Sequence, residues 1–370
     1  MTFILVRKLL RDVRPSLIVV CAVLFLFSAF WVKITQRVTV EIAPVFNTIA
    51  VKVGDKRLFE DVLFKGPGKV SQAALGWGDL NFERPNDFLA MGMLHPIVLT
   101  LCVVWAVGRS SSAVAGEIDR GTMELLMSQP VPRNRLILAH FLVDLIVLPT
   151  ICLAFFLGTQ FGLAVVGDFI PDYSSLKELN ERNMQVGLPG VNGTDGPTLQ
   201  VPQGIPGTSQ LLAILRGMGN KLVGDGSRPT FFQIPEHPQP LPVSGLGELP
   251  GLSNTVALMF AVSGITIAIS AAGRSRWKVV GFAVLGVVVM FIANTIGQLW
   301  EPSGFVRPLT VFFYYQPQKA MLGNDWLVDV GKVWKGAPSV PGIAVLLIVG
   351  ALGYLLALRT FARRDLPAPL

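Results

Sequence analysis

Six long apolar runs constrain the fold of this chain more than any other feature of its sequence. A hydrocarbon core about 30 Å thick is crossed by roughly 20 residues of apolar helix, and each run approaches or exceeds that length. The runs cover residues 16–32, 88–108, 136–166, 252–273, 279–299 and 340–358. Hydrophobic residues make up 51% of the chain and charged residues only 15%, as expected for a chain buried in lipid. The sequence therefore predicts an all-α integral membrane protein with six transmembrane helices.

Two of the runs carry residues that should distort their helices. The third run is longer than a bilayer requires and contains Asp144 and Pro149, which predicts a helix that is kinked, tilted or continued beyond the bilayer. The other five runs contain no formal charge. In the second run His95 precedes Pro96, and this pair predicts a local distortion of the helix.

The positions of Lys and Arg predict which ends of the runs face the cytoplasm. With the N-terminus inside, the inner segments are 1–15, 109–135, 274–278 and 359–370, and their 59 residues hold 14 of the 31 Lys and Arg. The outer segments hold the other 17 in 180 residues. Because inner segments are enriched in Lys and Arg, we predict an N-in, C-in multi-pass protein of the cell membrane. The net charge of +7 then reflects orientation, and no nucleic-acid partner is expected.

Residues 1–15 predict an amphipathic interfacial helix on the cytoplasmic leaflet. Arg7, Arg11 and Arg14 lie along one helical face and apolar side chains along another, so we expect the chain to turn into the membrane at Pro15. One alternative is that these cations simply flank the first span. Another is a signal peptide, but no clear cleavage site follows the run, which favours an uncleaved first helix.

Three outer segments separate the spans. Residues 33–87 contain alternating stretches such as VTVEIA, which predict a small strand-rich lobe. Residues 167–251 are rich in Pro and Gly, and their part 187–207 is expected to be a contact surface or a mobile cover. Within residues 300–339, the stretch RPLTVFFYYQPQKAM is aromatic-rich and too short to cross. It predicts a re-entrant or interfacial segment, with the aromatic residues 312–315 in the outer headgroup layer.

Several kinds of chemistry are poorly supported. The stretch GPGKVS at 66–71 lacks the leading Gly and the hydroxyl residue of a P-loop, so we expect no ATP site of that kind in this chain. The sequence has no G-x-S-x-G or H-E-x-x-H motif, and its three histidines lie in different segments. The outer segments contain no cysteine. We therefore predict no catalytic residues, metal site or bound cofactor, and an intramembrane enzyme is the least supported interpretation.

One pair of polar residues lies inside the third run. His140 and Asp144 are four residues apart and therefore share a helical face. They are candidates for a proton-linked intramembrane pair, because ionisable groups in lipid are costly and tend to be functional. The alternative is a polar contact that stabilises helix packing near the headgroups.

The longest internal cytoplasmic loop, 109–135, is charged although apolar runs flank it. Glu117 and Arg120 can pair on a helix that continues the second span and that Gly121 should end. Thr122 is expected to cap a second short helix whose Leu125 and Leu126 present apolar surface. Pro130 should end that helix, and Arg133 should anchor the re-entry at the headgroups. A short amphipathic elbow of this kind is suited to binding a soluble partner.

At these residues the chain resembles the permease subunits of ABC-2 type exporters. The resemblance rests on Glu117, on the pair Gly121 and Thr122, on Leu125 with Leu126, and on the Pro-x-x-Arg from Pro130 to Arg133. The amphipathic start, the six spans and the closing FARRDL are also similar to that family. The chain departs from the family at His140, where such permeases often have Lys, and in its larger second outer loop.

The resemblance implies a function and partners. The elbow would be the coupling helix that docks on a separately encoded cytoplasmic ATPase, which binds the ATP, and two permeases, identical or paralogous, would form the pathway. The predicted coupling residues are Glu117, Arg120, Gly121, Thr122, Leu125, Leu126, Pro130 and Arg133. The alternative function is a membrane scaffold whose two large outer segments hold an extracytoplasmic assembly or maturation complex.

Overall fold

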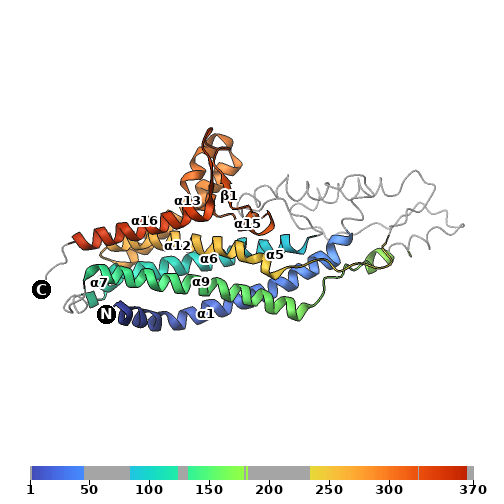
Figure 1. Cartoon of the computed structure of the whole chain (residues 1–370), viewed down its shortest axis with the longest axis horizontal. Helices are drawn as coiled ribbons and strands as arrows, with labels where there is room; N and C mark the ends of the chain where they lie inside the picture. The colour runs from blue at the N-terminus through green and yellow to red at the C-terminus, as the bar shows by residue number, and fades with distance from the viewer. Residues whose placement is uncertain are drawn as a thin grey trace, which may run out of the picture.

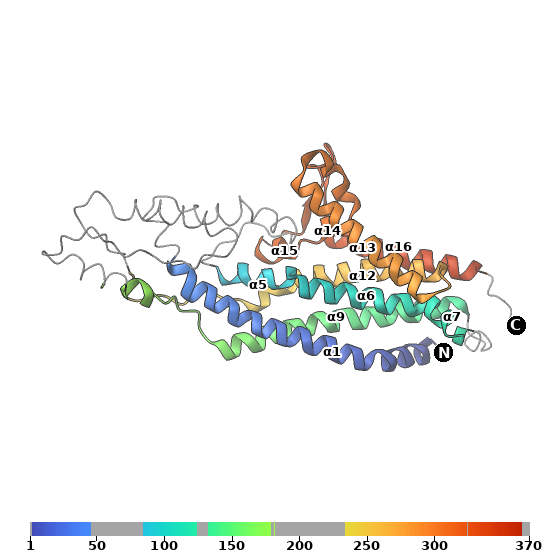
Figure 2. The ribbon, with the colours of Figure 1, turned by 180° about the vertical axis from the view of Figure 1, so that it is seen from behind.

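The computed structural model describes residues 2–45, 84–123, 132–178, 181, 234–323 and 325–364. Within them, six helices or stacked helical segments are long and apolar enough to cross a membrane. These segments are Thr2–Val45, Pro85–Asp119, Arg133–Val166, Gly245–Ala272, Arg276–Leu299 and Gly342–Arg363. The helices that run side by side along the molecule are α1, Thr2–Arg37, α6, Pro96–Ser111, α9, Arg133–Val166, α12, Leu249–Ala272, and α16, Gly342–Arg363 (Figures 1 and 2). Helix α1 begins at the end of the bundle where α16 finishes. The predicted all-α membrane fold is confirmed.

The first helix is continuous, contrary to the predicted turn at Pro15. Helix α1 spans Thr2–Arg37 with Pro15 inside it, so residues 1–15 are not a separate interfacial helix. A proline removes one helical hydrogen bond but does not have to end a helix whose neighbours hold its direction. Here α1 packs against α9, Arg133–Val166, along the bundle.

The predicted strand character of VTVEIA is also wrong. These residues continue α1 as a π-helical turn, η1, which spans Val38–Ile42. The hydroxyl of Thr39 donates to the carbonyl of Thr35 at 2.8 Å, and Arg37 pairs with Glu41 one turn away at 3.0 Å. These contacts along the helix outweigh the local alternation of apolar and polar residues. The rest of that predicted lobe, 46–83, lies outside the described residues.

The second span is divided at His95, as predicted. Helix α5, Pro85–Leu94, ends there, and α6, Pro96–Ser111, begins on the other side. His95 has an extended backbone, with ψ of 133°, and its side chain accepts a hydrogen bond from the amide of Ile97. Because Pro96 has no amide hydrogen and disfavours a helical residue before it, the break falls at this position.

Small residues bring two pairs of helices into close contact. Between α1 and α9, a Cβ added to Gly158 would lie 2.3 Å from the carbonyl oxygen of Phe25, and Ser28 donates to the carbonyl of Phe155 at 2.8 Å. Between α12, Leu249–Ala272, and α16, Gly342–Arg363, a Cβ on Gly353 would lie 2.3 Å from the backbone of Gly264. Close approach at small residues is a common way for helices to pack in lipid.

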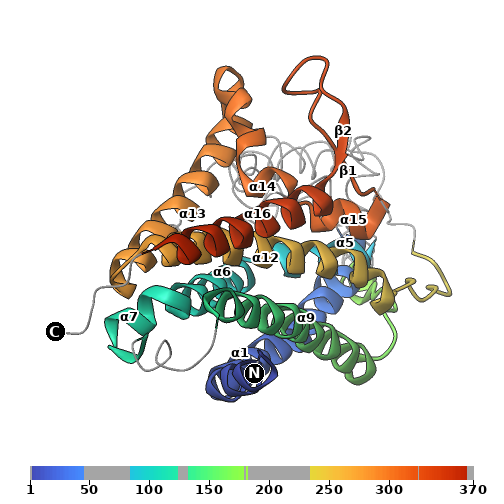
Figure 3. The ribbon, with the colours of Figure 1, turned by 60° about the vertical axis from the view of Figure 1, so that its left-hand side comes forward.

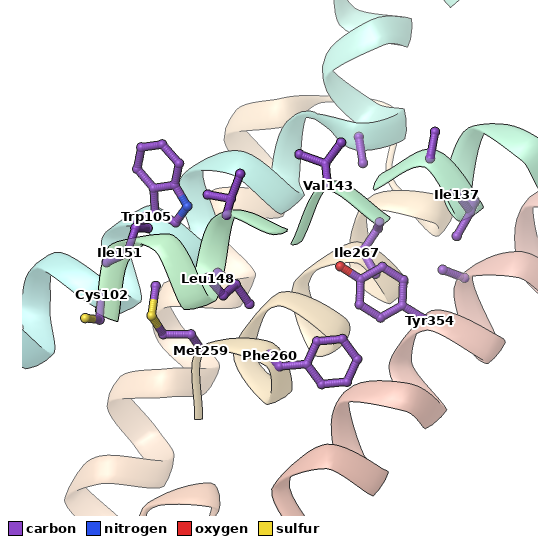
Figure 4. Packing of buried hydrophobic residues seen from close by; sticks show 14 of the residues in the cluster. Cys102, Trp105, Ile137, Val143, Leu148, Ile151, Met259, Phe260, Ile267 and Tyr354 are labelled. Carbon is purple, nitrogen blue, oxygen red and sulfur yellow. The ribbon is translucent and has the colours of Figure 1, made fainter. Parts of the chain in front are cut away.

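The core lies around α12, which is the most buried of the spanning helices. Its Met259, Phe260 and Ile267 pack with Trp105 of α6 and Tyr354 of α16 (Figure 4). By contrast, α13, Arg276–Leu299, is mostly exposed and diverges from the bundle (Figure 3). A helix that is apolar on an exposed face is expected to contact lipid.

The segment after α13 contains only short elements. These are the 3-10 helix η4, Glu301–Leu309, the helices α14, Val311–Tyr314, and α15, Pro317–Gly323, and an antiparallel pair of strands, β1, Leu327–Asp329, and β2, Ser339–Pro341. They agree with a segment that does not cross the bilayer.

The aromatic rings of this segment lie elsewhere than predicted. Phe312, Phe313 and Tyr315 are buried, and Tyr315 donates to the carbonyl of Met93 at 3.1 Å. These three rings therefore fill the protein interior instead of facing the headgroups as predicted.

Two parts of the second outer segment are described. Residues 167–178 and 234–244 run beside the end of the first span, where Leu241 donates to the carbonyl of Phe169 and Asp172 to that of Val40, both at 2.8 Å. The 3-10 helix η3, Gly245–Glu248, then leads into α12. The stretch 187–207 lies outside the described residues.

Candidate functional site

The second span ends in a π-helical turn that is fixed to α12. This turn, η2, spans Ser112–Gly116, and its Val114 and Ala115 are fully buried. The hydroxyl oxygen of Ser270 accepts hydrogen bonds from the amides of both residues, at 3.2 and 3.1 Å, and donates to the carbonyl of Ser111 at 3.0 Å. A π-turn disturbs the regular helical ladder, so a partner on another helix is needed for its buried amides. Ser270 therefore links the exit of the second span to α12.

A small polar cluster follows this turn. The single helical turn α7, Glu117–Asp119, carries Glu117, whose carboxylate accepts hydrogen bonds from the Arg120 guanidinium and from the Thr122 hydroxyl. The side chain of Glu117 is 17% exposed and that of Arg120 is 54% exposed. Glu117 is therefore the centre of the cluster, while Arg120 faces outward. The predicted pairing of Glu117 with Arg120 is present in the structure.

Gly121 follows the end of α7 and adopts a left-handed backbone conformation. Its φ is 70°, a left-handed conformation that glycine adopts without strain, and its amide donates to the carbonyl of Ile118. The end of the helix at Gly121 agrees with the sequence prediction. The hydroxyl of Thr122 bonds back to Glu117, and the amides that it was predicted to cap belong to residues outside the described ranges. Leu125, Leu126 and Pro130 also lie outside them.

Arg133 lies at the start of α9 and contacts the end of α16. Its guanidinium donates to the backbone carbonyl of Arg364. Arg364 in turn donates to the carbonyls of Ala271 and Gly273, both at 2.8 Å, at the end of α12. Arg133 was predicted as a headgroup anchor. In the structure it joins the start of α9 to the end of α16 and, through Arg364, to the end of α12, while its anchoring at the headgroups stays a prediction.

A buried charged network joins α6, α9 and α16. Arg109 of α6 forms an ion pair with Asp144 of α9, and the hydroxyl of Tyr354 of α16 donates to the second carboxylate oxygen. Arg109 also donates to the backbone carbonyl of His140 at 3.3 Å. The side chains of Arg109 and Asp144 are 6% and 1% exposed. Because each charge is neutralised by the other, the network can exist inside an apolar bundle.

The predicted pairing of His140 with Asp144 is not observed. The His140 Nδ1 is buried and has no hydrogen-bond partner within the described chain, while Asp144 is engaged by Arg109 and Tyr354. Sequence reasoning missed these two partners. Arg109 directly follows the second run, and Tyr354 is the only tyrosine within the sixth, so both could have been considered as partners for a carboxylate in the third.

The polar contacts of this region join several helices of the bundle. Within the ranges that the structure describes, no group of three or more His, Cys, Asp or Glu side chains could hold a metal ion. The polar cluster, the Ser270 contacts and the charged network instead connect the short helix α7 to α6, α9, α12 and α16. The cluster, the start of α1 and the end of α16 share one end of the bundle (Figures 1 and 3).

Comparison with known families agrees with this arrangement. A family model described as "ABC-2 family transporter protein" matches residues 4–366, nearly the whole chain. Comparisons with curated proteins and with solved structures gave no significant match.

Proposed function

The chain belongs to the ABC-2 transporter family, and on this premise we propose that it is the permease subunit of an ATP-driven exporter, coupled to a separate cytoplasmic ATPase. The proposal includes the N-in, C-in orientation in the cell membrane, which places α7 and both ends of the chain on the ATPase side. It also includes a second permease, identical or paralogous, which would complete the pathway.

The observation that supports coupling most directly is the polar cluster around Glu117. It presents a partly exposed arginine, Arg120, at the bundle end, five residues before the first leucine of the apolar pair Leu125 and Leu126. An ATPase that binds this elbow would bury the leucines, each contributing about 1.5 to 3 kcal/mol, while the charges set orientation and salt dependence. Glu117 would hold Arg120 and Thr122 in the docking geometry.

The contacts between α7 and the spanning helices could carry a motion of the ATPase into the bundle. A displacement of α7 acts directly on η2, which Ser270 links to α12. Helix α6 is joined through Arg109 and Asp144 to α9, and through Tyr354 to α16. The helices that form the core would therefore respond together when the ATPase moves the elbow.

Co-purification with the ATPase tests the proposal. The chain is co-expressed with each candidate ABC ATPase of its own genome, and the permease is captured from detergent. Replacing both Leu125 and Leu126 with Asp should reduce recovery of the ATPase about 100-fold or more, because two buried leucines are lost. The control replaces Leu355 and Leu356 of α16 with Ala, since this is also an adjacent pair of leucines and both side chains are exposed.

Three results would be decisive. Loss of the ATPase with intact membrane insertion supports docking at the elbow. Wild-type recovery of the ATPase with both aspartates would contradict it. If no ATPase is recovered even with the wild-type chain and extracytoplasmic proteins are recovered instead, the scaffold function is favoured.

A further inference from the structure

Arg307 on η4 is held in one orientation by contacts from two neighbouring helices. Its aliphatic stem packs on α13 at Gly297, where an added Cβ would lie 2.5 Å from the Arg307 Cγ. Its Nε donates to the Asn294 Oδ1 at 3.5 Å, and its guanidinium carbon lies 5.1 Å from the centroid of the Phe313 ring. The contact with the Phe313 ring and the hydrogen bond to Asn294 therefore orient the guanidinium before any ligand binds.

The charge of Arg307 is not paired with an acidic side chain of any residue that the structure describes. No carboxylate lies within 4.0 Å of it in the described part of the chain, whereas Arg109 and Arg120 each pair with one. Apart from the weak bond to Asn294, its guanidinium donates to no described residue, and its Nη atoms are not buried. Partial burial lowers the pKa of the Arg307 guanidinium, because the cation has lost part of its hydration. An anion at the free Nη edge would offset that loss.

Exposed apolar side chains lie near Arg307 in the sequence. On the same segment, Trp300 is 61% exposed, Phe305 60% and Leu309 67%. The indole of Trp334 donates to the carbonyl of Phe305 at 3.0 Å and ties the strand connection to η4. In Figure 3 this region projects beside α13, away from the bundle core. A cation flanked by exposed apolar groups matches a ligand with an anionic head and an apolar tail.

We propose that Arg307 binds the phosphate headgroup of an anionic amphiphile, whose apolar chain lies over Phe305 and Leu309. The two Nη donors would bind two phosphate oxygens, and the ring of Phe313 would keep the guanidinium plane in place. This inference goes beyond the proposed function and does not depend on ATPase coupling. The same phosphate chemistry could come from a membrane lipid or from free phosphate, and the structure favours the lipid because apolar groups are exposed beside the cation.

The experiment measures binding of phosphatidylglycerol to the full-length chain. The protein is reconstituted in phosphatidylcholine nanodiscs with and without phosphatidylglycerol, and retained lipid is counted by native mass spectrometry. Arg307→Gln should weaken retention of phosphatidylglycerol about tenfold, because a charge-assisted contact is lost. Arg307→Lys should retain part of it. The control Lys332→Gln removes an exposed cation from the adjoining strand connection and should leave retention unchanged.

A second variant keeps the test independent of folding. Phe305→Ser with Leu309→Ser changes only exposed side chains, and it should reduce retention of the lipid while Arg307 stays intact. Inorganic phosphate, added as a competitor, should not displace the lipid at similar concentrations. Equal retention of phosphatidylglycerol by the wild type and Arg307→Gln would overturn the proposal. Displacement by inorganic phosphate with no effect of the double serine variant would also overturn it, since the ligand would then be a soluble anion.

Discussion

Tyr354 of α16 donates a hydrogen bond to Asp144 of α9 inside the helical bundle, and the same carboxylate is paired with Arg109 of α6. Three helices are thereby joined by one buried acid. In an apolar environment, loss of either partner of the acid costs free energy, because the group that loses its contact stays buried without water to replace it.

We expect Asp144→Leu to destabilise the bundle by about 3 to 5 kcal/mol, since it leaves the Arg109 cation buried and unpaired. The double variant Arg109→Met with Asp144→Leu should be less damaging than the single change. Thermal unfolding in detergent measures both. Asp119→Asn, at an exposed position of α7, is the control and should behave like the wild type. A single Asp144 variant as stable as the wild type would show that the network is dispensable.

Ser270→Ala should loosen the π-turn η2 without unfolding the protein. It removes the acceptor for the buried amides of Val114 and Ala115, at a cost of about 1 to 3 kcal/mol. Hydrogen exchange followed by mass spectrometry should show faster exchange of peptides covering 112–116. Ser253→Ala is the matched control, because the exposed Ser253 only donates to Pro250 within its own helix. Unchanged exchange in the Ser270 variant would argue against this link.

Gly158→Ala should separate α1 from α9. The added Cβ would lie 2.3 Å from the carbonyl oxygen of Phe25, a backbone atom that cannot move away by itself. Overpacking of this kind costs about 1 to 3 kcal/mol, so we expect a lower unfolding temperature and lower yield from membranes. Gly286→Ala on α13 is the control, since nothing lies within 4 Å of its added Cβ. If the two variants have the same unfolding temperature and yield, α1 and α9 can move apart without loss of stability.

Cysteine labelling tests the proposed orientation. The variants are built after replacing the three native cysteines with Ser or Ala. A membrane-impermeant thiol reagent added to sealed cells should modify cysteines introduced at Asp55 and Asn192 but not at Thr122. The expectation follows from the enrichment of Lys and Arg in the inner segments. Labelling at Thr122 from outside would invert or exclude the topology, and with it the coupling role of the elbow.

Local signals explain the sequence predictions that the structure confirmed. The six spans follow from hydropathy, which needs no knowledge of neighbours because lipid forces backbone hydrogen bonds to close within each helix. The break at His95 follows from the backbone preference imposed by Pro96. The helix end at Gly121 follows from the freedom of glycine at positive φ.

The sequence by itself therefore determined that six apolar spans form and where two helices stop, since these features depend on residues a few positions apart. Only the tertiary structure decided that α1 passes through Pro15, that VTVEIA is helical and that Phe312 and Phe313 point inward. It also decided that Asp144 pairs with Arg109 and Tyr354 and not with His140. The physical reason is the same in each case. The alternative local conformations or pairings differ by only a few kcal/mol. The side chains whose contacts decide between them come from helices that are distant in the sequence.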